Sequence, residues 1–266
     1  MRRITNRPSR LLAAILALAA VTPLPALAAE ITVMSSGGFT AALQSLAPAF
    51  ERKTGNSVRF VLGPSMGTSE EAIPVRLAHG ERADLLIMVG DGLDDLVRKG
   101  FAKAGSRIDL ARSRIGMVVR AGQPKPDIST LDAFKKVLLS AKSIAYSDSA
   151  SGVYIANEMF ARLGLEAELR PKSRMIVAER VGNVVSRGEA EVGFQQVSEL
   201  LPVKGIEFVG TIPDEVQKVT VFSAGLPVAA REPQAAQALV KFLASPEARA
   251  AVVATGLDPV IPEPSR

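Results

Sequence analysis

The stretch Ile31-Thr32-Val33-Met34-Ser35-Ser36-Gly37-Gly38-Phe39-Thr40 contains the change of pattern that decides the fold. Its first half is apolar and β-branched, which is typical of a strand. After the Ser-Gly turn, apolar residues recur with the spacing of one helix face, at Phe39, Leu43, Leu46 and Phe50. The stretch therefore predicts a strand, a polar turn and a helix. Such a turn presents free backbone N–H groups at the positive end of the helix dipole.

Ser35, Ser36 and Gly37 in this turn admit two interpretations. Hydroxyl groups beside the N–H groups of a helix start suit a bound anion. A turn of this composition also simply caps a helix, and for one turn taken alone that is the commoner explanation. The functional interpretation gains weight because similar turns occur twice more along the chain.

The second and third turns repeat the order of strand, Ser/Gly turn and helix. A predicted strand over 57–62 is followed by Gly63-Pro64-Ser65-Met66-Gly67-Thr68-Ser69, and one over 143–146 by Ser147-Asp148-Ser149-Ala150-Ser151-Gly152. Ligands of open α/β sheets bind beyond the carboxyl ends of the strands. The candidate ligand contacts in these turns are Ser65, Thr68, Ser69, Ser149 and Ser151.

The first residues have the pattern of a secretory signal peptide. Four arginines precede a short apolar run over 11–20, and Ala26-Leu27-Ala28 places small residues at the cleavage-defining positions. We predict cleavage after Ala28, export to the periplasm and no membrane insertion of the mature chain. The apolar run is too short, and too broken by Pro23 and Pro25, to be a good membrane span.

The composition excludes several kinds of function. Without the four arginines of the predicted signal peptide, 28 of the 32 basic residues remain against 27 acidic ones, so the charge gives no argument for nucleic-acid binding. The chain has no cysteine, which excludes disulfides, cysteine-ligated zinc and thiol catalysis. Because it has a single histidine, His79, a mechanism that needs two histidines is excluded too. We expect no cofactor and no metal held by side chains.

Strands and helices alternate through the whole mature chain, which predicts an α/β protein with mostly parallel strands. The run Ala83-Asp84-Leu85-Leu86-Ile87-Met88-Val89 is apolar almost throughout, as in a strand that is covered on both faces. We place crossings between two lobes near 118–121 and within the strand predicted over 218–224. The predicted organisation is a signal peptide over 1–28, a first lobe over 29–118 and 222–266, and a second lobe over 119–221.

The order and spacing of these motifs resemble the class II periplasmic solute-binding proteins, and most closely their molybdate-binding branch. The resemblance rests on 31–46, on the 83–87 strand, on Ser149-Ala150-Ser151-Gly152-Val153-Tyr154 and on 188–196, and it covers essentially the whole mature chain. It implies two α/β lobes that are joined by two hinge strands and close on a ligand. By resemblance, ligand contacts fall on Ser35 or Ser36, on Ser65, and on the turn from Ser149 to Ser151.

Two departures from the molybdate-binding branch lie where the ligand would be. That branch has a tyrosine after the strand that here reads Gly193-Phe194-Gln195-Gln196, so Gln195 or Gln196 takes its place. The second turn is also longer than usual. Amides and a longer turn suit a larger, less symmetric anion such as a polycarboxylate, and the aconitate isomerases form a related exported branch that acts on a tricarboxylate.

Two functions therefore remain open for the sequence. The first is a binding protein that delivers a small anion to an ABC transporter permease, and we expect such a binder to be a monomer. The second is an isomerase that moves the double bond of a substrate such as trans-aconitate, which needs one base and anion clamps. The nearby candidates for that base are Glu70, Glu71, His79, Asp148 and Tyr154, and the sequence does not single out a catalytic residue among them.

Three arginines are candidate carboxylate clamps. Arg76 and Arg82 flank the helix after the second turn, and Arg180 begins a helix near the strand that ends at Gln196. Arginine binds carboxylates through two parallel N–H groups. Such residues are more often solvated or paired with neighbouring acids. Tyr154 is equally open, since a buried tyrosine needs a partner for its hydroxyl and either the cleft or the core can supply one.

Overall fold

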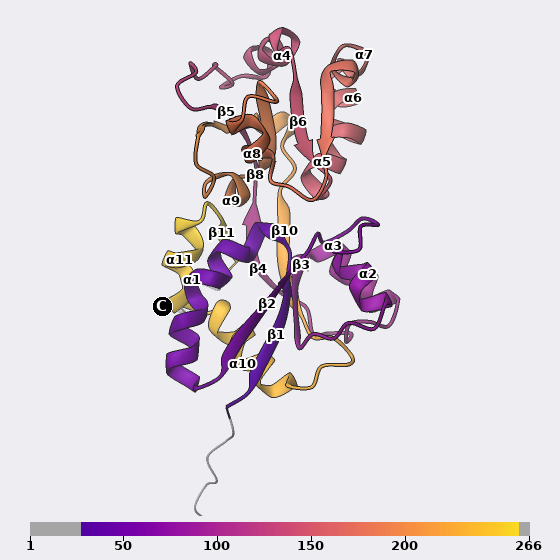
Figure 1. Ribbon diagram of the computed structural model, residues 1–266, viewed down its shortest axis with the longest axis vertical. Coiled ribbons are helices and arrows are strands. Elements are labelled where there is room, and N and C mark those ends of the chain that lie inside the picture. Colours follow the sequence, from indigo (N-terminus) through magenta and orange to yellow (C-terminus); the bar gives the residue numbers. More distant parts are fainter. Residues whose placement is uncertain (1–27, 261–266) are drawn as a thin grey trace, which may run out of the picture.

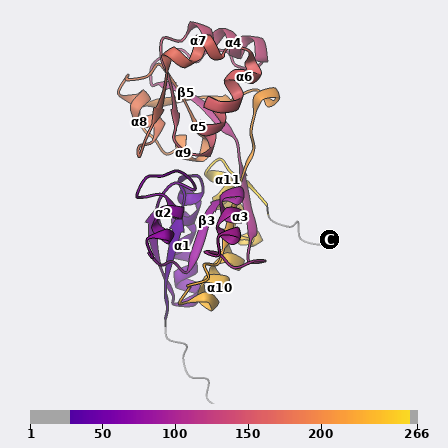
Figure 2. The ribbon, with the colours of Figure 1, turned by 90° about the vertical axis from the view of Figure 1, so that its right-hand side faces the viewer.

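The computed structural model describes residues 28–260 as two α/β lobes placed one above the other (Figure 1). Each lobe is built on its own mixed sheet. In Figure 2 the segments that connect the lobes run along one side of the molecule. This architecture confirms the predicted two-lobe α/β fold. The predicted signal peptide lies outside the described residues, apart from Ala28.

The first lobe has a six-stranded sheet. In spatial order its strands are β11 (Asp258–Pro259), β4 (Ile108–Ser113), β10 (Thr220–Gly225), β3 (Leu85–Val89), β1 (Glu30–Ser35) and β2 (Ser57–Leu62). Its helices are α1 (Gly37–Thr54), α2 (Ile73–Ala78), α3 (Gly90–Arg98), α10 (Pro233–Leu243), the 3₁₀ turn η4 (Pro246–Ala248) and α11 (Arg249–Ala254). β1 pairs in parallel with both β2 and β3, so the ends of these three strands meet at one edge.

The second lobe has a five-stranded sheet. In spatial order its strands are β7 (Ser173–Ile176), β6 (Ile144–Ser147), β8 (Val192–Gln196), β5 (Ile115–Arg120) and β9 (Ile206–Thr211). The α-helices are α4 (Leu131–Ser140), α5 (Ala150–Tyr154), α6 (Phe160–Leu163), α7 (Glu166–Leu169), α8 (Val181–Ser186) and α9 (Val197–Leu200). A π-helical turn η1 (Ile155–Met159) joins α5 to α6, and 3₁₀ turns are η2 (Arg170–Lys172) and η3 (Asp214–Val216).

Most strands of each sheet point the same way, as predicted. β10 and β11 run against the other four strands of the first sheet, and β5 runs against the other four of the second. The parallel strands β1, β2 and β3 are connected by helices, and so are β6, β7 and β8. The antiparallel strands β5 and β10 lie where the chain enters and leaves the second lobe.

The helix after the first turn forms as its spacing predicts. Phe39, Leu43, Leu46 and Phe50 are all buried on one face of α1. Phe50 packs against Phe242 of α10, with ring centroids 5.7 Å apart. Burial of this apolar stripe against the sheet and α10 is the main source of stability for such a helix.

The apolar run of β3 is also buried on both faces, as its sequence predicts. Leu85, Ile87 and Val89 contribute to one hydrophobic cluster. Leu86 and Met88, which point the other way, contribute to a second cluster with α2 and α3. β3 therefore lies at the centre of the first lobe, and its carboxyl end is fixed.

The chain changes sheets at other residues than the predicted boundaries of 118/119 and 221/222. It enters the second sheet at Arg114, between β4 and β5, and returns between Thr211 and Thr220. The strand β4 was missed in the sequence because its segment, Ile-Asp-Leu-Ala-Arg-Ser, mixes polar and apolar residues and is separated from β5 by a single residue. Among residues 28–260 no helix is long and apolar enough to cross a membrane.

Candidate functional site

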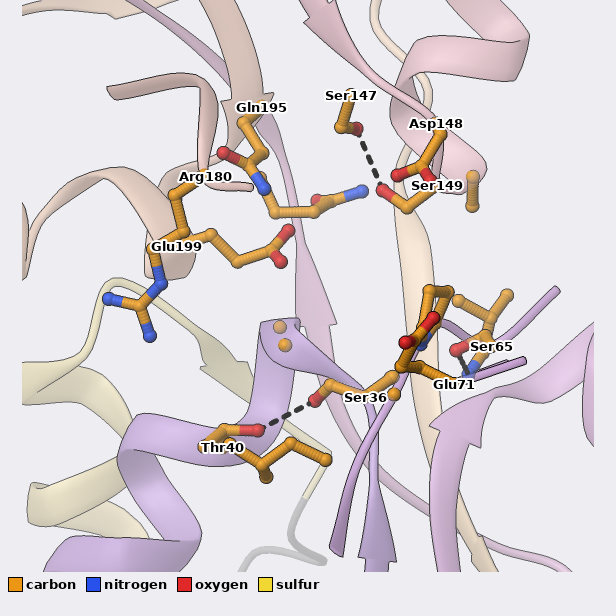
Figure 3. Close-up of a pocket in the computed structure, with 18 of the residues that line it drawn as sticks. Ser36, Thr40, Ser65, Glu71, Ser147, Asp148, Ser149, Arg180, Gln195 and Glu199 are labelled. Carbon is orange, nitrogen blue, oxygen red and sulfur yellow. Dashed lines mark hydrogen bonds between the residues drawn. The ribbon is translucent and has the colours of Figure 1, made fainter. Parts of the chain in front are cut away.

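A cavity of about 300 Å³ lies between the lobes, where the strand ends of both sheets meet (Figure 3). The first lobe contributes the turns after β1, β2 and β3, and the second contributes the turn after β6, the loop before α8 and the end of β8 with α9. The predicted site residues that line it are Ser36, Gly37, Ser65, Ser69, Ser149, Arg180, Gln195 and Gln196. All three predicted turns therefore reach one cavity.

In the first turn, Ser36 and Ser35 have different roles. Ser36 is the N-cap residue of α1, yet its side chain makes no capping hydrogen bond. Within residues 28–260 its buried hydroxyl oxygen has no partner, and it lines the cavity. The Ser35 hydroxyl instead contacts the Ser36 backbone oxygen at 3.3 Å and the Thr40 hydroxyl at 3.3 Å, and Ser35 is not part of the lining. Ser36 is thus the serine of this pair that can donate to a ligand.

In the second turn, Ser65 lines the cavity and is hydrogen-bonded to the end of β3. The backbone N–H of Val89, the N-cap residue of α3, donates to the Ser65 hydroxyl oxygen at 2.9 Å. A hydroxyl that accepts one bond still carries a proton to donate. Ser69 also lines the cavity, whereas Thr68 is exposed and does not.

In the third turn, three serine hydroxyls form a connected group. Ser147 is 2.8 Å from Ser149 and 3.2 Å from Ser151, measured between the hydroxyl oxygens. Ser147, Asp148 and Ser149 line the cavity, and Ser151 lies behind them. Ser147 begins the predicted third turn but was not among the predicted contacts; in the structure it is the last residue of β6.

Both glutamines at the end of β8 line the cavity and are buried. The Gln195 side-chain oxygen accepts the backbone N–H of Val181 at 2.9 Å, which fixes it to the start of α8. Gln196 donates to the Thr220 hydroxyl at 3.0 Å, and its side-chain oxygen has no partner among the described residues. The two side-chain amides thus have fixed orientations and can still make hydrogen bonds to a ligand.

Tyr154 does not lie in this cavity. Its hydroxyl donates to the Val216 backbone oxygen at 2.8 Å and accepts from Arg162 at 3.0 Å. Burial raises the pKa of Tyr154, against the opposing effect of Arg162. The hydroxyl therefore has its partners inside the second lobe, and the predicted ligand role for Tyr154 is not supported by its position.

Of the three predicted arginines, Arg180 lines the cavity and Arg76 and Arg82 do not. Arg76 donates to Glu81 at 2.8 Å and to the Glu71 backbone oxygen at 3.0 Å, and Arg82 is exposed outside the lining. Arg180 lines the cavity two residues after Ala178, which has a left-handed backbone with φ of 57°. Such a conformation is strained for a residue other than glycine, and strain of this kind clusters at functional sites.

Of the five predicted candidates for a base, only Glu71 and Asp148 line the cavity. Glu70 and His79 are exposed outside it. A further acid, Glu199 of α9, was missed in the sequence and lines the cavity with only 8% of its surface exposed. It follows Gln196 within a four-residue helix, so no motif distinguishes it.

Glu199 lies directly against the start of α1. A Cβ atom built on Gly37 would be 2.1 Å from the Glu199 Oε1 atom, so the carboxyl group in its present position occupies the space that a side chain at this residue would fill. In Figure 3 the carboxyl points into the cavity. Burial is the largest cause that raises the pKa of Glu199, Arg180 and the Gln195 side chain lower it, and the nearby Asp148 raises it, with a net value of about 7. A carboxyl that titrates near neutrality is suited to proton transfer.

The site therefore combines two chemical capacities. The start of the 18-residue helix α1 and the Ser36 hydroxyl favour negative charge. The Glu199 carboxyl beside them can take up or release a proton. The residues described contain no cluster of three His, Cys, Asp or Glu side chains that could hold a metal ion.

The chain belongs to the family of bacterial extracellular solute-binding proteins, whose model matches residues 31–258. The family resemblance noted from the sequence is thereby confirmed. An aconitate isomerase of a Pseudomonas species is 50% identical over 244 residues, which cover 90% of this chain and 93% of the relative.

Two molybdate-binding comparisons agree with this family. The molybdate-binding protein ModA of Azotobacter vinelandii is 27% identical over 237 residues, covering 86% of this chain and 90% of ModA. The solved structure of the Azotobacter vinelandii periplasmic molybdate-binding protein superposes with a TM-score of 0.69 at 23% identity. It covers 88% of this chain and 100% of the other. That structural likeness confirms the two-lobe fold.

Proposed function

We propose that this protein is an isomerase that interconverts trans- and cis-aconitate in the cavity between its lobes. The observation that carries the proposal is the buried Glu199 carboxyl, with a pKa of about 7, against the start of α1. The relative that is 50% identical along nearly its whole length is an aconitate isomerase, which supports the same substrate.

The reaction moves a double bond by moving one proton. A base removes a proton from the CH₂ group next to a carboxylate, and the electron pair shifts toward the carbon–carbon double bond. A proton then returns at the far end of the three-carbon unit, so the substrate and product have the same atoms and no oxidant or reductant is needed. The Glu199 carboxylate serves as the base, because a base with a pKa near the working pH is the most effective.

The groups around Glu199 suit a substrate with three carboxylates. Ser36, Ser65 and Ser149 come from three separate turns, and each can donate to a different carboxylate. Arg180 supplies the positive charge of a clamp from the second lobe. Donors that are fixed before the reaction stabilise the additional negative charge that develops when the proton leaves.

A second candidate function is delivery of a polycarboxylate or molybdate-like anion to an ABC transporter permease. The family match favours it, and so does the Ser36 hydroxyl at the start of α1, which has no partner among residues 28–260 and can bind an anion without any chemistry. For either function we propose that 1–28 is a signal peptide, that the mature chain is periplasmic and that it is a monomer.

The test is conversion of trans-aconitate by the purified mature protein, followed by proton NMR. We expect cis-aconitate to accumulate, with kcat/KM rising with pH up to about 7 and then levelling as Glu199 loses its proton. Glu199→Gln should lower kcat by about 10²–10⁴-fold. The matched control is Glu207→Gln, which changes a partly exposed acid paired with Lys125 on the second lobe. Tight binding of aconitate without conversion would favour the transport function instead.

A further inference from the structure

The short helix α9 packs in the second lobe, where Leu200 joins a hydrophobic cluster with Val118, and it is also attached to the first lobe. It follows β8 directly, and its Ser198 hydroxyl donates to the Gly38 backbone oxygen of α1 at 2.7 Å. Ser198 is 1% exposed, so water does not compete for this bond. The bond joins residues 160 positions apart in the chain.

Apolar contacts attach α9 to the first lobe at its other face. A Cβ atom on Gly256, after α11, would lie 2.7 Å from the Val197 side chain and 2.8 Å from that of Leu201. Both ends of α9 are therefore held by elements of the first lobe. Figure 1 shows α9 at the boundary of the lobes, next to α1 and α11.

The start of α1 has two glycines where α9 and β10 contact it. A Cβ atom on Gly38 would lie 2.0 Å from the Phe222 ring, just as one on Gly37 would collide with Glu199. Two successive glycines thus let β10 on one side and α9 on the other approach the helix start closely. Glu199, one residue after Ser198, is held at the place where α1 favours negative charge.

We infer that Ser198 is a positioning residue, which holds Glu199 against the start of α1 by anchoring α9 to the first lobe. The base and the first turn then form one preassembled half of the site, and the turn from Ser147 to Ser149 completes it from the second lobe. The catalytic part of this inference rests on the proposed isomerase function. The positioning part concerns the environment of Glu199 and does not depend on that function.

The inference is tested through the ionisation of Glu199. The charged groups that face it are Arg180 before α8 and Asp148 after β6, and Glu71 and Glu179 also line the cavity. None of these is altered by Ser198→Ala. If the hydroxyl holds Glu199 in its buried place, its loss lets water reach the carboxyl, and the pKa of Glu199 falls toward its usual value of 4.5.

The measurement is carbon NMR of the mature protein with labelled glutamate carboxyl carbons, titrated with acid. The resonance absent from Glu199→Gln identifies Glu199. We expect its midpoint to fall in Ser198→Ala and kcat/KM for trans-aconitate to fall about tenfold to a hundredfold through misplacement of the base. The control, Ser186→Ala, removes a similar hydroxyl bond, 2.7 Å to the Asn183 backbone oxygen in α8, and should leave the midpoint unchanged.

A second variant tests the same anchor if Ser198→Ala does not fold. Leu201→Ala shortens a side chain that is 46% exposed and lies against Gly256, so it removes little buried surface. We expect a smaller shift of the Glu199 midpoint in the same direction. An unchanged midpoint in the folded variants would overturn the inference, even if melting temperatures fall. A wild-type protein that converts no aconitate would overturn the proposed function alone, because the titrations still report on the anchor.

Discussion

Two adjacent serines show how far neighbouring residues can differ in role. Ser35 has its hydroxyl partners inside the first lobe, whereas the Ser36 hydroxyl is buried in the cavity lining and has none among the residues described. A hydrogen bond to a charged group contributes about 1.5–3 kcal/mol. We therefore expect Ser36→Ala to weaken binding of the bound carboxylate about tenfold to a hundredfold, with little loss of stability.

Ser35→Ala is the matched control for that prediction. It should lower the free energy of unfolding by about 0.5–1.5 kcal/mol and leave affinity almost unchanged. Calorimetric titration with trans-aconitate and chemical denaturation of both variants separate the two effects. Equal affinities for Ser36→Ala and the wild type would show that the anion does not contact this hydroxyl.

The buried Glu199 carboxyl predicts a dependence of stability on pH. Its pKa is about 7 in the folded protein against a usual 4.5, so the folded state keeps a proton that the unfolded chain loses. Stability from this group is fully present below about pH 4.5 and is lost as the pH rises to about 7. Each pKa unit is worth 1.36 kcal/mol, so the loss amounts to about 3 kcal/mol.

Glu199→Gln removes that titration. We expect its free energy of unfolding, relative to the wild type, to increase between about pH 4.5 and 7 and to stay level above. Urea denaturation of both proteins at several pH values in this range measures the difference. A difference that does not change with pH would mean that Glu199 ionises normally in the folded protein.

The site residues were predictable only where the chain repeats a recognisable pattern. The three Ser/Gly turns follow strands, and all three reach the cavity. Glu199 has no recognisable pattern around it in the sequence. Its place in the site depends on contact with Gly37, which lies 162 positions earlier. Tyr154 shows the converse, because its need for a hydroxyl partner was predictable but the partner, Val216, was not. Contacts between distant segments are what a local pattern omits.

At the scale of elements, the Asp84 side chain joins three segments of the first lobe. Its carboxylate accepts the backbone N–H of Thr32 in β1 at 2.9 Å, and those of Arg231 and Glu232 before α10 at 2.8 and 2.9 Å. Asp84 thus fixes the start of β3 to its neighbour β1 and caps α10. The bond from Thr32 is buried, and leaving a buried donor without a partner costs about 1–3 kcal/mol.

We therefore expect Asp84→Ala to lower the free energy of unfolding by at least about 2 kcal/mol. Asp84→Asn, which keeps one acceptor oxygen, should lose less. Chemical denaturation of the two variants measures the order. Because Asp84 is remote from the cavity lining, the folded fraction of either variant should bind its anion as the wild type does.

Among the elements, those with a strong period were predicted and those without were missed. α1 and β3 bury the residues that their patterns indicate. The helix predicted after the third turn is not a regular α-helix, because it contains the π-helical turn η1, which no spacing of apolar residues reveals. β7 was also missed, since it is a short edge strand with one buried residue, Ile176.

At the scale of the whole molecule, the arrangement of the lobes explains why a ligand in the cavity is contacted from two opposite sides. The first lobe and α9 present the start of α1, Ser65 and Glu199 as one surface. The second lobe adds Ser147, Asp148 and Ser149, which face that surface across the cavity. The segments that connect the lobes run along one side of the molecule (Figure 2), and a ligand held by both lobes stabilises their closed arrangement.

That arrangement leads to a prediction about ligand class. The cavity of about 300 Å³ is at the lower end of the range of about 300–1,000 Å³ for small-molecule sites, and a tetrahedral anion with four oxygens fills only part of it. Its donors come from three turns and from two glutamine side chains, so they are spread around the walls. A compact oxyanion cannot reach all of them at once, whereas the three carboxylates of aconitate point in different directions. We therefore expect tricarboxylates to bind more tightly than molybdate.

A thermal-shift screen of the mature protein against both aconitates, citrate, sulfate, tungstate and molybdate measures this order. A ligand at about a hundred times its Kd adds about 2.7 kcal/mol to the free energy of unfolding, which is enough to raise the melting temperature clearly. We expect the aconitates to give the largest rise, and Ser36→Ala to reduce it while Ser35→Ala does not. A large rise with molybdate and none with any tricarboxylate would mean that the glutamines at the end of β8 close around a small anion, and the site would then belong with those of the molybdate binders.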